Sequence, residues 1–251
     1  RKESSAASDV YKRQLINNVK KNASNGSGRI AWNLRHKSYY PIRSGSFRGG
    51  WGWSPSGPYA TPGDYQAELF LENNGSIEKL DGPINFSVKP LREGTLKGAS
   101  YDEYNRFRER VSGLFINISK YEDVFSIIGN KIQLLEKASM QLESFSPDII
   151  AKISDFKDRY NDYEYENDSS PARDEIGEWY KPNLGARIRI AMQGLSTSYG
   201  PTELNSSNLE IAEKHFEKMK NEVEQLNKEV KDLEDEVKQL NPPYIIGQGI
   251  D

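Results

Sequence analysis

The last part of the chain carries the pattern that most constrains the fold, a row of apolar residues at alternating spacings of three and four. The row lies within about Thr202 to Leu240 and comprises Leu209, Ala212, Phe216, Met219, Val223, Leu226, Val230, Leu233, Val237 and Leu240. Nearly all positions between them are Lys, Glu, Asp, Asn or Gln. This repeat predicts one helix of about 39 residues, ~58 Å long, whose narrow seam packs along another long helix.

A matching seam between Tyr104 and Leu142 predicts the other long helix. Ser100 and Glu103 form a capping box that predicts its start, and Ser146-Pro147 predicts its end. Similar spacings predict two shorter helices, at about Pro147–Tyr163 and about Leu184–Leu195. Residues 100–241 are therefore expected to form an antiparallel bundle of three to four helices.

Residues 15–95 show a different sequence pattern, in which short alternating apolar runs are separated by Gly, Pro, Asn and Ser. Three strands are predicted at Arg29–Arg35, Asp64–Glu72 and Ile84–Val88, the first with Ile30, Trp32 and Leu34 on one face. Asn73-Asn74-Gly75 predicts a hairpin turn before the third. Since so few strands cannot close two layers, the predicted class is α+β: a truncated Ig/fibronectin-like antiparallel β-sandwich followed by the helical bundle.

Composition excludes several kinds of partner. The 34 basic residues are interspersed with 37 acidic ones and the net charge is −3, so nucleic acid is not expected to bind. No apolar stretch has the length of a membrane helix, so no membrane insertion is expected. The chain has no cysteine and two histidines, His36 and His215, in different predicted regions. We therefore expect no cofactor, no metal site and no catalytic residues.

The two ends of the chain are set apart from these regions. Residues 4–14, SSAASDVYKRQ, resemble the in-frame translation of a transposase adapter used in DNA library preparation. Residues 1–14 are therefore expected to be an artefactual tail, with the natural protein continuing upstream of about Leu15. Residues 242–251 are expected to form a C-terminal tail.

A Gly-rich aromatic stretch from Tyr39 to Pro62 holds the candidate ligand-binding residues, which are Arg48, Trp51, Trp53 and Tyr59. Aromatic rings beside arginine could stack against sugar rings or accept a cation. The same rings could instead cap the open edge of the sandwich, while glycine permits tight bends. The second interpretation is preferred, because exposed aromatic clusters are more often interfaces than ligand sites.

Several of these segments, taken in order, resemble one known family. The segments Gly28–Arg35 (GRIAWNLR), Pro62–Glu72 (PGDYQAELFLE) and INFSVKP, followed by long helices, resemble the C-terminal region of bacterial sortilin-like BNR-repeat (Asp-box) β-propeller proteins, often labelled glycosyl hydrolases. Asn33 stands where that family usually has Asp. The resemblance implies a sandwich and a helical bundle that follow a secreted, periplasmic or cell-envelope propeller, whose Asp-box repeats are absent from this sequence.

The leading functional hypothesis is a non-catalytic structural or interaction module whose partner is its own upstream propeller, or else a polysaccharide or protein. One alternative is a carbohydrate-binding accessory module that uses the aromatic stretch. Another is a part of a glycoside hydrolase whose active site lies in the propeller. The three differ in whether the aromatic rings are exposed and in where the catalytic carboxylates lie.

Overall fold

The chain has an α+β fold, with its strands in the first 90 residues and its helices in the remainder. A computed structural model describes residues 2–9, 15–23, 25–42, 56–92, 94–95, 97–142, 146–167, 175–177 and 181–243. Among the described residues, contacts define two compact units. One comprises Arg1–Ser112 with Ala191–Ser206, and the other Gly113–Ile190 with Ser207–Asp251.

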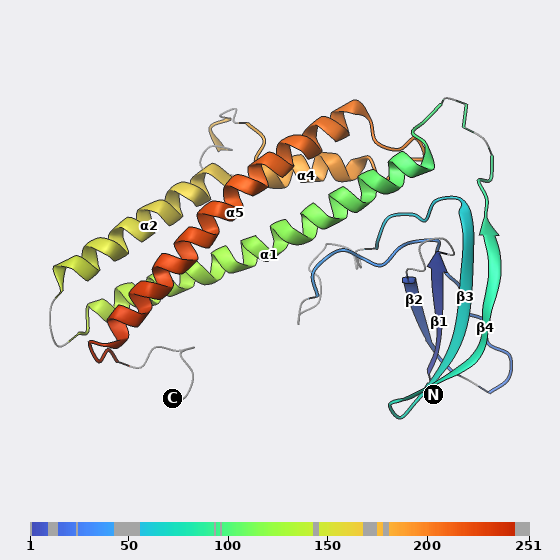
Figure 1. The fold of residues 1–251 in the computed structure, drawn as a ribbon, viewed down its shortest axis with the longest axis horizontal. Helices are drawn as coiled ribbons and strands as arrows, with labels where there is room; N and C mark the ends of the chain where they lie inside the picture. The colour runs from blue at the N-terminus through green and yellow to red at the C-terminus, as the bar shows by residue number, and fades with distance from the viewer. Residues whose placement is uncertain are drawn as a thin grey trace. The chain divides into compact units, whose positions relative to one another are not determined.

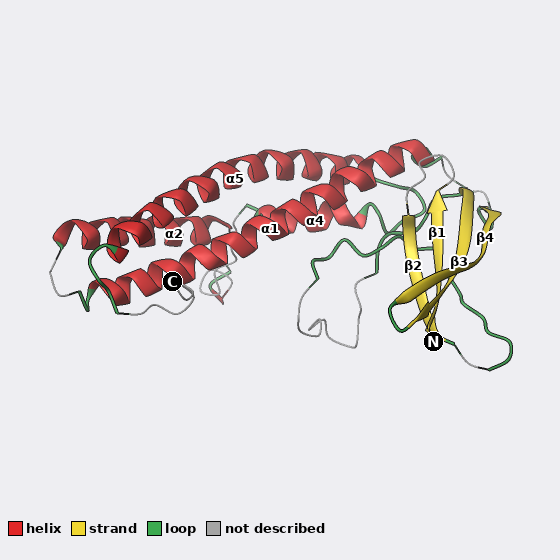
Figure 2. Cartoon of the chain, turned by 60° about the horizontal axis from the view of Figure 1, so that its bottom comes forward, coloured by secondary structure: helices red, strands yellow, loops and turns green. Residues whose placement is uncertain are grey.

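The strands form one antiparallel sheet (Figures 1 and 2). Their order across the sheet is β2 (Leu15–Asn22), β1 (Lys2–Asp9), β3 (Gly63–Asn73) and β4 (Ser76–Val88). Strand β1 therefore lies in the middle of the sheet, although it belongs to the predicted tail 1–14. The adapter origin of residues 4–14 stays a prediction.

The hairpin between β3 and β4 is confirmed. Asn74 and Gly75 both have positive φ, 48° and 85°, which suits the tight turn expected from Asn73-Asn74-Gly75. Directly paired residues share a face, so Tyr65 lies beside Phe86 and Ala67 beside Ile84. Alternation along β3 adds Leu69 and Leu71 to the same side, where their partners on β4 are Asp81 and Glu78. We call the apolar residues of this side the apolar face of the sheet: Tyr65, Ala67, Leu69, Leu71, Ile84 and Phe86.

The predicted strand at Arg29–Arg35 is not found. Only Arg35 pairs, in an isolated bridge with Tyr59. Leu34 has a φ of 58°, which interrupts an extended backbone, so Ile30, Trp32 and Leu34 cannot share one strand face. Trp32 still contributes to the core, because its ring meets Tyr65 edge-on at a centroid distance of 5.6 Å.

The predicted sandwich is not found among the described residues, since every named strand belongs to one sheet. Trp32 also lies edge-on to Phe86, at 6.1 Å, and so covers one end of the apolar face. Farther along this face, Ile84 is 55% exposed. The described residues thus cover the apolar face only in part.

Four helices are described, and their bounds lie close to the predicted ones: α1 (Tyr101–Ser139), α2 (Pro147–Asn167), α4 (Leu184–Gln193) and α5 (Glu203–Lys238). The capping box of α1 is confirmed, because Glu103 N donates to Ser100 Oγ at 3.2 Å and Ser100 N donates to Glu103 Oε2 at 2.8 Å. A similar exchange between Thr202 and Asn205 caps α5. None of the described helices is long and apolar enough to cross a membrane.

The predicted seam of α5 is buried, and that of α1 is buried except at Tyr121, Phe125 and Leu142. On α5, the row from Leu209 to Val237 is at most 6% exposed: Leu209, Ala212, Phe216, Met219, Val223, Leu226, Val230, Leu233 and Val237. Leu240, the last residue of the predicted seam, lies beyond the helix and is 37% exposed. The helices therefore supply most of the buried apolar residues of the described chain.

Polar contacts between helices fix their directions. Lys131 of α1 binds Glu234 of α5 at 2.7 Å and Tyr121 bonds to Glu224, so residue numbers rise together and the two helices run parallel. This differs from the expected antiparallel arrangement. Helix α2 is antiparallel to both: Lys152 binds Glu236 and Lys157 binds Glu136, each at 2.7 Å, with Glu136 on α1 and Glu236 on α5.

Helix α4 lies beside the start of α5, because Arg187 Nη1 of α4 donates to Asn208 Oδ1 of α5 at 3.0 Å. Helices α2 and α4 therefore lie beside different stretches of α5, as Figures 1 and 2 also show.

Candidate functional site

Tyr59 is the described member of the sequence-predicted ligand set. Arg48, Trp51 and Trp53 lie outside the residues that the structure describes. The Tyr59 side chain is 51% exposed, as a stacking platform requires. Its surroundings decide how much of the ring is open to a ligand.

Arg35 covers one face of the Tyr59 ring, with its guanidinium carbon 3.7 Å from the ring centroid. Arg35 Nη1 also donates to the Gly57 carbonyl at 3.0 Å, which holds the guanidinium in place. The backbone carbonyl of Arg35 accepts hydrogen bonds from Trp32 Nε1 at 2.8 Å and from Asn17 Nδ2 at 2.9 Å. The cation–π pair is thus anchored on several sides, and a sugar ring could stack only on the other face of Tyr59.

Two backbone segments hold this pair. His36 N donates to the Pro58 carbonyl at 2.9 Å and Ala60 N donates to the Leu34 carbonyl at 2.8 Å. A Cβ atom at Gly57 would lie 2.3 Å from the Lys37 carbonyl oxygen, so only glycine permits so close an approach. Residues 34–37 and 57–60 therefore form a tight ribbon.

The ribbon also contacts the first turns of α1. His36 Nε2 lies 2.6 Å from Arg108 Nη1, and Asn105 Nδ2 donates to Thr61 Oγ1 at 3.3 Å. The Arg108 side chain is only 14% exposed. These residues all belong to the unit that contains the sheet.

Two tyrosines complete this region. Burial, with smaller contributions from Tyr40 and Tyr104, raises the pKa of Tyr39 to about 12. Burial also raises the pKa of Tyr104, whose hydroxyl donates to the Leu195 carbonyl at 3.0 Å. Both phenols therefore stay protonated at neutral pH, and Tyr104 serves as a structural hydrogen-bond donor.

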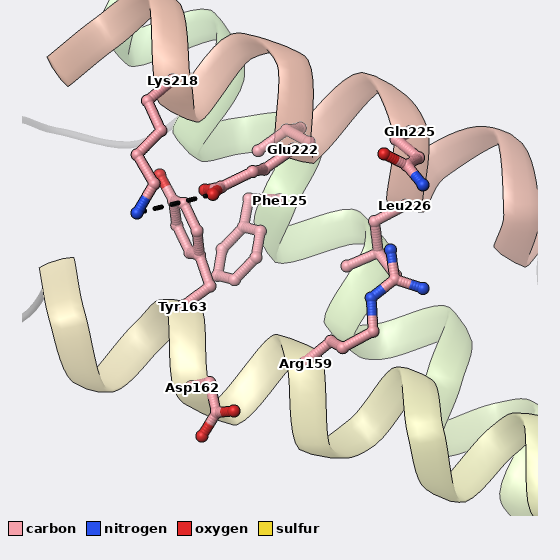
Figure 3. A pocket seen from close by; sticks show the side chains of 9 residues that line it. Phe125, Arg159, Asp162, Tyr163, Lys218, Glu222, Gln225 and Leu226 are labelled. Carbon is pink, nitrogen blue, oxygen red and sulfur yellow. Dashed lines mark ion pairs between the residues drawn. The ribbon is translucent and has the colours of Figure 1, made fainter.

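A second candidate site is a small groove between α1, α2 and α5, with a volume of about 210 Å³. Phe125, Tyr163, Val223 and Leu226 supply its apolar lining, and charged side chains surround it (Figure 3). Phe125 stacks on Tyr160 at a centroid distance of 4.2 Å and an interplanar angle of 7°. The aromatic residues are thus part of the packing between α1 and α2.

The cations of the groove already have acidic partners. Arg159 binds Glu229, and Lys218 Nζ lies 3.6 Å from Glu222 Oε1 (Figure 3). Burial alone would raise the pKa of Glu229, but hydrogen bonds from Arg159 and Gln225 outweigh it and lower that pKa. The charges therefore stabilise the helix packing, and nothing in the groove selects one ligand chemistry.

No group of three or more His, Cys, Asp or Glu residues is placed to hold a metal ion in the part of the chain that the structure describes. His215 lies on α5, where burial and the nearby cations Arg187 and Lys218 lower its pKa. His36 contacts a different residue, Arg108. The contacts given for the two histidines therefore involve different residues.

Comparison with known proteins adds no relative, since no protein-family model, curated protein or solved structure matches this chain. The resemblance to sortilin-like BNR-repeat proteins therefore stays a prediction.

Sequence reasoning did not identify Arg35, His36 and Arg108 as a group. Arg35 ends the GRIAWNLR segment, and Arg108 follows the seam residue Phe107 on α1. No spacing rule connects them, because they meet only when the ribbon packs on the helix. Their one sequence signal is that arginine beside an aromatic-rich stretch favours cation–π contacts.

Proposed function

We propose that this chain is a non-catalytic structural and interaction module that belongs to a secreted or cell-envelope BNR-repeat propeller protein. In this proposal the sheet is one layer of an Ig-like sandwich, the helices form a bundle, and the partner is the propeller of the same polypeptide. The observation that carries the proposal is the partly covered apolar face of the sheet.

The two faces of the hairpin differ in a way that supports docking on one side. On the polar face, Lys79 binds Glu68 at 2.6 Å and Ser87 Oγ donates to Asp64 Oδ1 at 2.7 Å. On the apolar face, Ile84 is 55% exposed although its neighbour Tyr65 is 4% exposed. An apolar face beside a formed core is the usual place for a second layer to pack.

The helices support the same proposal in another way. Their inter-helix carboxylates, including Glu136, Glu229, Glu234 and Glu236, bind lysine or arginine of a neighbouring helix. A glycosidase needs a carboxylic acid whose pKa is raised in an apolar pocket. The pKa of Glu229 is instead lowered, so this carboxylate suits an ion pair and not a general acid.

Two isoleucines on β4 make a matched test of docking. Ile84 lies on the apolar face, whereas Ile77 pairs with Glu72 on the polar face and is 69% exposed. The chain would be mixed with the propeller encoded upstream of it, and binding measured by calorimetry. We expect Ile84→Lys to abolish binding and Ile77→Lys to preserve it. Equal affinities for both variants, or no binding by the unaltered chain, would contradict the proposal.

Carbohydrate binding is the second candidate, favoured by the exposed Tyr59 ring. Tryptophan fluorescence during titration with bacterial and plant polysaccharides tests it. A saturable change that is lost in Trp51→Ala and Trp53→Ala would favour sugar binding over a purely structural role. Turnover of any glycoside by the chain itself would instead favour the glycoside hydrolase hypothesis.

A further inference from the structure

The tripeptide Asn-Gly-Ser occurs twice in the chain, at residues 25–27 and at residues 74–76. Asn25 and Asn74 are both exposed. The glycines that follow them, Gly26 and Gly75, both have positive φ, 95° and 85°, and a Cβ atom at either would have nothing within 4 Å. The two sites therefore match in sequence, in exposure and in the space around the glycine.

An asparagine that is followed by glycine can lose its side-chain amide without an enzyme. The backbone nitrogen of the glycine attacks Cγ of the asparagine, so that an N–Cγ bond forms, the Cγ–Nδ2 bond breaks, and ammonia leaves with the proton of the attacking nitrogen. Water then opens the succinimide ring at either carbonyl and gives aspartate or isoaspartate. Glycine favours the first step, because it has no Cβ atom to obstruct the approach of its nitrogen to Cγ.

Ring closure depends on the freedom of the backbone around the asparagine. The torsions there must rotate until the nitrogen of the next residue reaches Cγ. A backbone that is held by neighbouring hydrogen bonds makes this rotation only after local opening, which costs free energy and lowers the reactive fraction. The rate at each site therefore reports how firmly the fold holds the segment.

Asn74 lies in the turn that connects β3 to β4, and the two strands pair directly beside it. Asn73 is opposite Ser76, and Glu72 is opposite Ile77. Asn74 itself has a φ of 48°, as this tight turn requires. Rotation of the backbone at Asn74 therefore requires the end of the β3–β4 ladder to open.

Asn25 lies beyond the end of β2 at Asn22, and residues 25–34 contain neither helix nor strand. Across this stretch, Lys21 Nζ donates to the Arg29 carbonyl at 3.0 Å. This contact is made by an exposed lysine side chain, which constrains the backbone at Asn25 less than a β-ladder does. The fold thus holds the first Asn-Gly-Ser less firmly than the second.

We propose that Asn25 is a site of spontaneous deamidation in the folded protein, and that the hairpin protects the identical tripeptide at Asn74. The proposal is independent of the docking partner proposed above, because the reaction needs only water. Its product would place a carboxylate in residues 20–29, which contain Lys and Arg but no Asp or Glu. Where the product is isoaspartate, the main chain also becomes longer by one methylene group.

Peptide mapping by mass spectrometry tests the proposal on the complete chain. Samples would be incubated at slightly alkaline pH, in buffer and in urea that unfolds the chain, and digested at acidic pH, which stops the reaction. In buffer we expect Asn25 to convert at least about tenfold faster than Asn74, whereas in urea the two identical tripeptides should convert at the same rate. Equal rates in buffer, or faster conversion of Asn74, would overturn the proposal. An Asn25 that stays intact in buffer but converts in urea would overturn it as well.

A variant and a urea series separate the site from its protection. Asn25→Gln should remove the fast product and leave the conversion of Asn74 unchanged, because glutamine would have to close a larger ring. A fast product that persists in this variant would mean that another residue reacts, and the proposal would fail. Raising the urea concentration stepwise should accelerate Asn74 as the hairpin opens and change the rate at Asn25 little. A parallel rise at both sites would show that the fold holds them equally and would contradict the proposal.

Discussion

The helical seam and the β-sheet differ in how completely they bury their apolar side chains. Ile128, Val230 and Val237 in the seam are 0% exposed, whereas Ile84 on the apolar face of the sheet is 55% exposed. The seam is closed because α1, α2 and α5 all come from this chain and pack on one another. Among the described residues, Trp32 lies over one end of the apolar face, and Ile84 farther along it is exposed. A region that is closed by its own chain stabilises the fold, and one that is partly open is available for a partner.

Truncating one isoleucine in each region should have the largest effect and test the comparison. We expect Ile128→Ala to lower the free energy of unfolding by about 3 kcal/mol, because it leaves a cavity in a closed seam. Ile84→Ala should change it by less than about 0.5 kcal/mol, since the side chain is already half in water. Urea denaturation measures both. Ile127→Ala is the control on α1, because Ile127 is 48% exposed. If it lowered the free energy of unfolding as much as Ile128→Ala, the burial of one specific face of α1 would be contradicted.

Two glycines on α1 test how closely neighbouring elements pack against this helix. A Cβ at Gly129 would lie 2.5 Å from Tyr160, whose ring is held by its stack on Phe125, so Gly129→Ala should destabilise by about 2 kcal/mol. Nothing lies within 4 Å of a Cβ at Gly113, where alanine should stabilise by up to about 1 kcal/mol through helix propensity. Thermal unfolding of the two variants should shift in opposite directions. Stabilisation by both substitutions would mean that α2 does not approach α1 closely at Gly129.

The ion pair of Arg159 and Glu229 should have the smallest effect, because both side chains are about one-third exposed and water screens them. We expect Glu229→Gln to cost about 0.5 kcal/mol at pH 7. The pKa of Glu229 is lowered in the folded chain, so its contribution is complete above the unfolded value of about 4.3 and is lost as pH falls through the folded pKa. Denaturation curves of the variant and the unaltered chain should therefore converge in acid. A difference that grows below pH 4 would contradict this.

The helices could be predicted from the sequence because their determinants are local. Seam spacing placed α1, α2, α4 and α5, and the capping box fixed the start of α1 at Tyr101. The hairpin was predictable for the same reason, since Asn74 and Gly75 tolerate positive φ. Helix direction was not predictable, because a symmetric heptad seam packs equally well in either orientation until specific pairs such as Lys131 with Glu234 decide it.

The candidate site was less predictable, because its contacts are made between distant segments. Tyr59 was identified, but not Arg35, whose guanidinium covers one face of its ring. The predicted strand at Arg29–Arg35 was wrong, because only Arg35 pairs, in a single bridge; the positive φ of Leu34 is one feature that alternation of apolar residues does not reveal. The contact of His36 with Arg108 was not predictable either, since it depends on how the ribbon packs on α1.

Hydrogen exchange of the complete chain tests the central claim most directly, namely that the described residues close the helical seam but cover the sheet only in part. The account predicts that amides of the α1 and α5 seams exchange only on global unfolding. It predicts that the amides joining β3 to β4 exchange on the order of 100-fold faster, through local opening. Equal protection of the sheet and the seam would contradict the account and remove the ground for a docking partner on the apolar face.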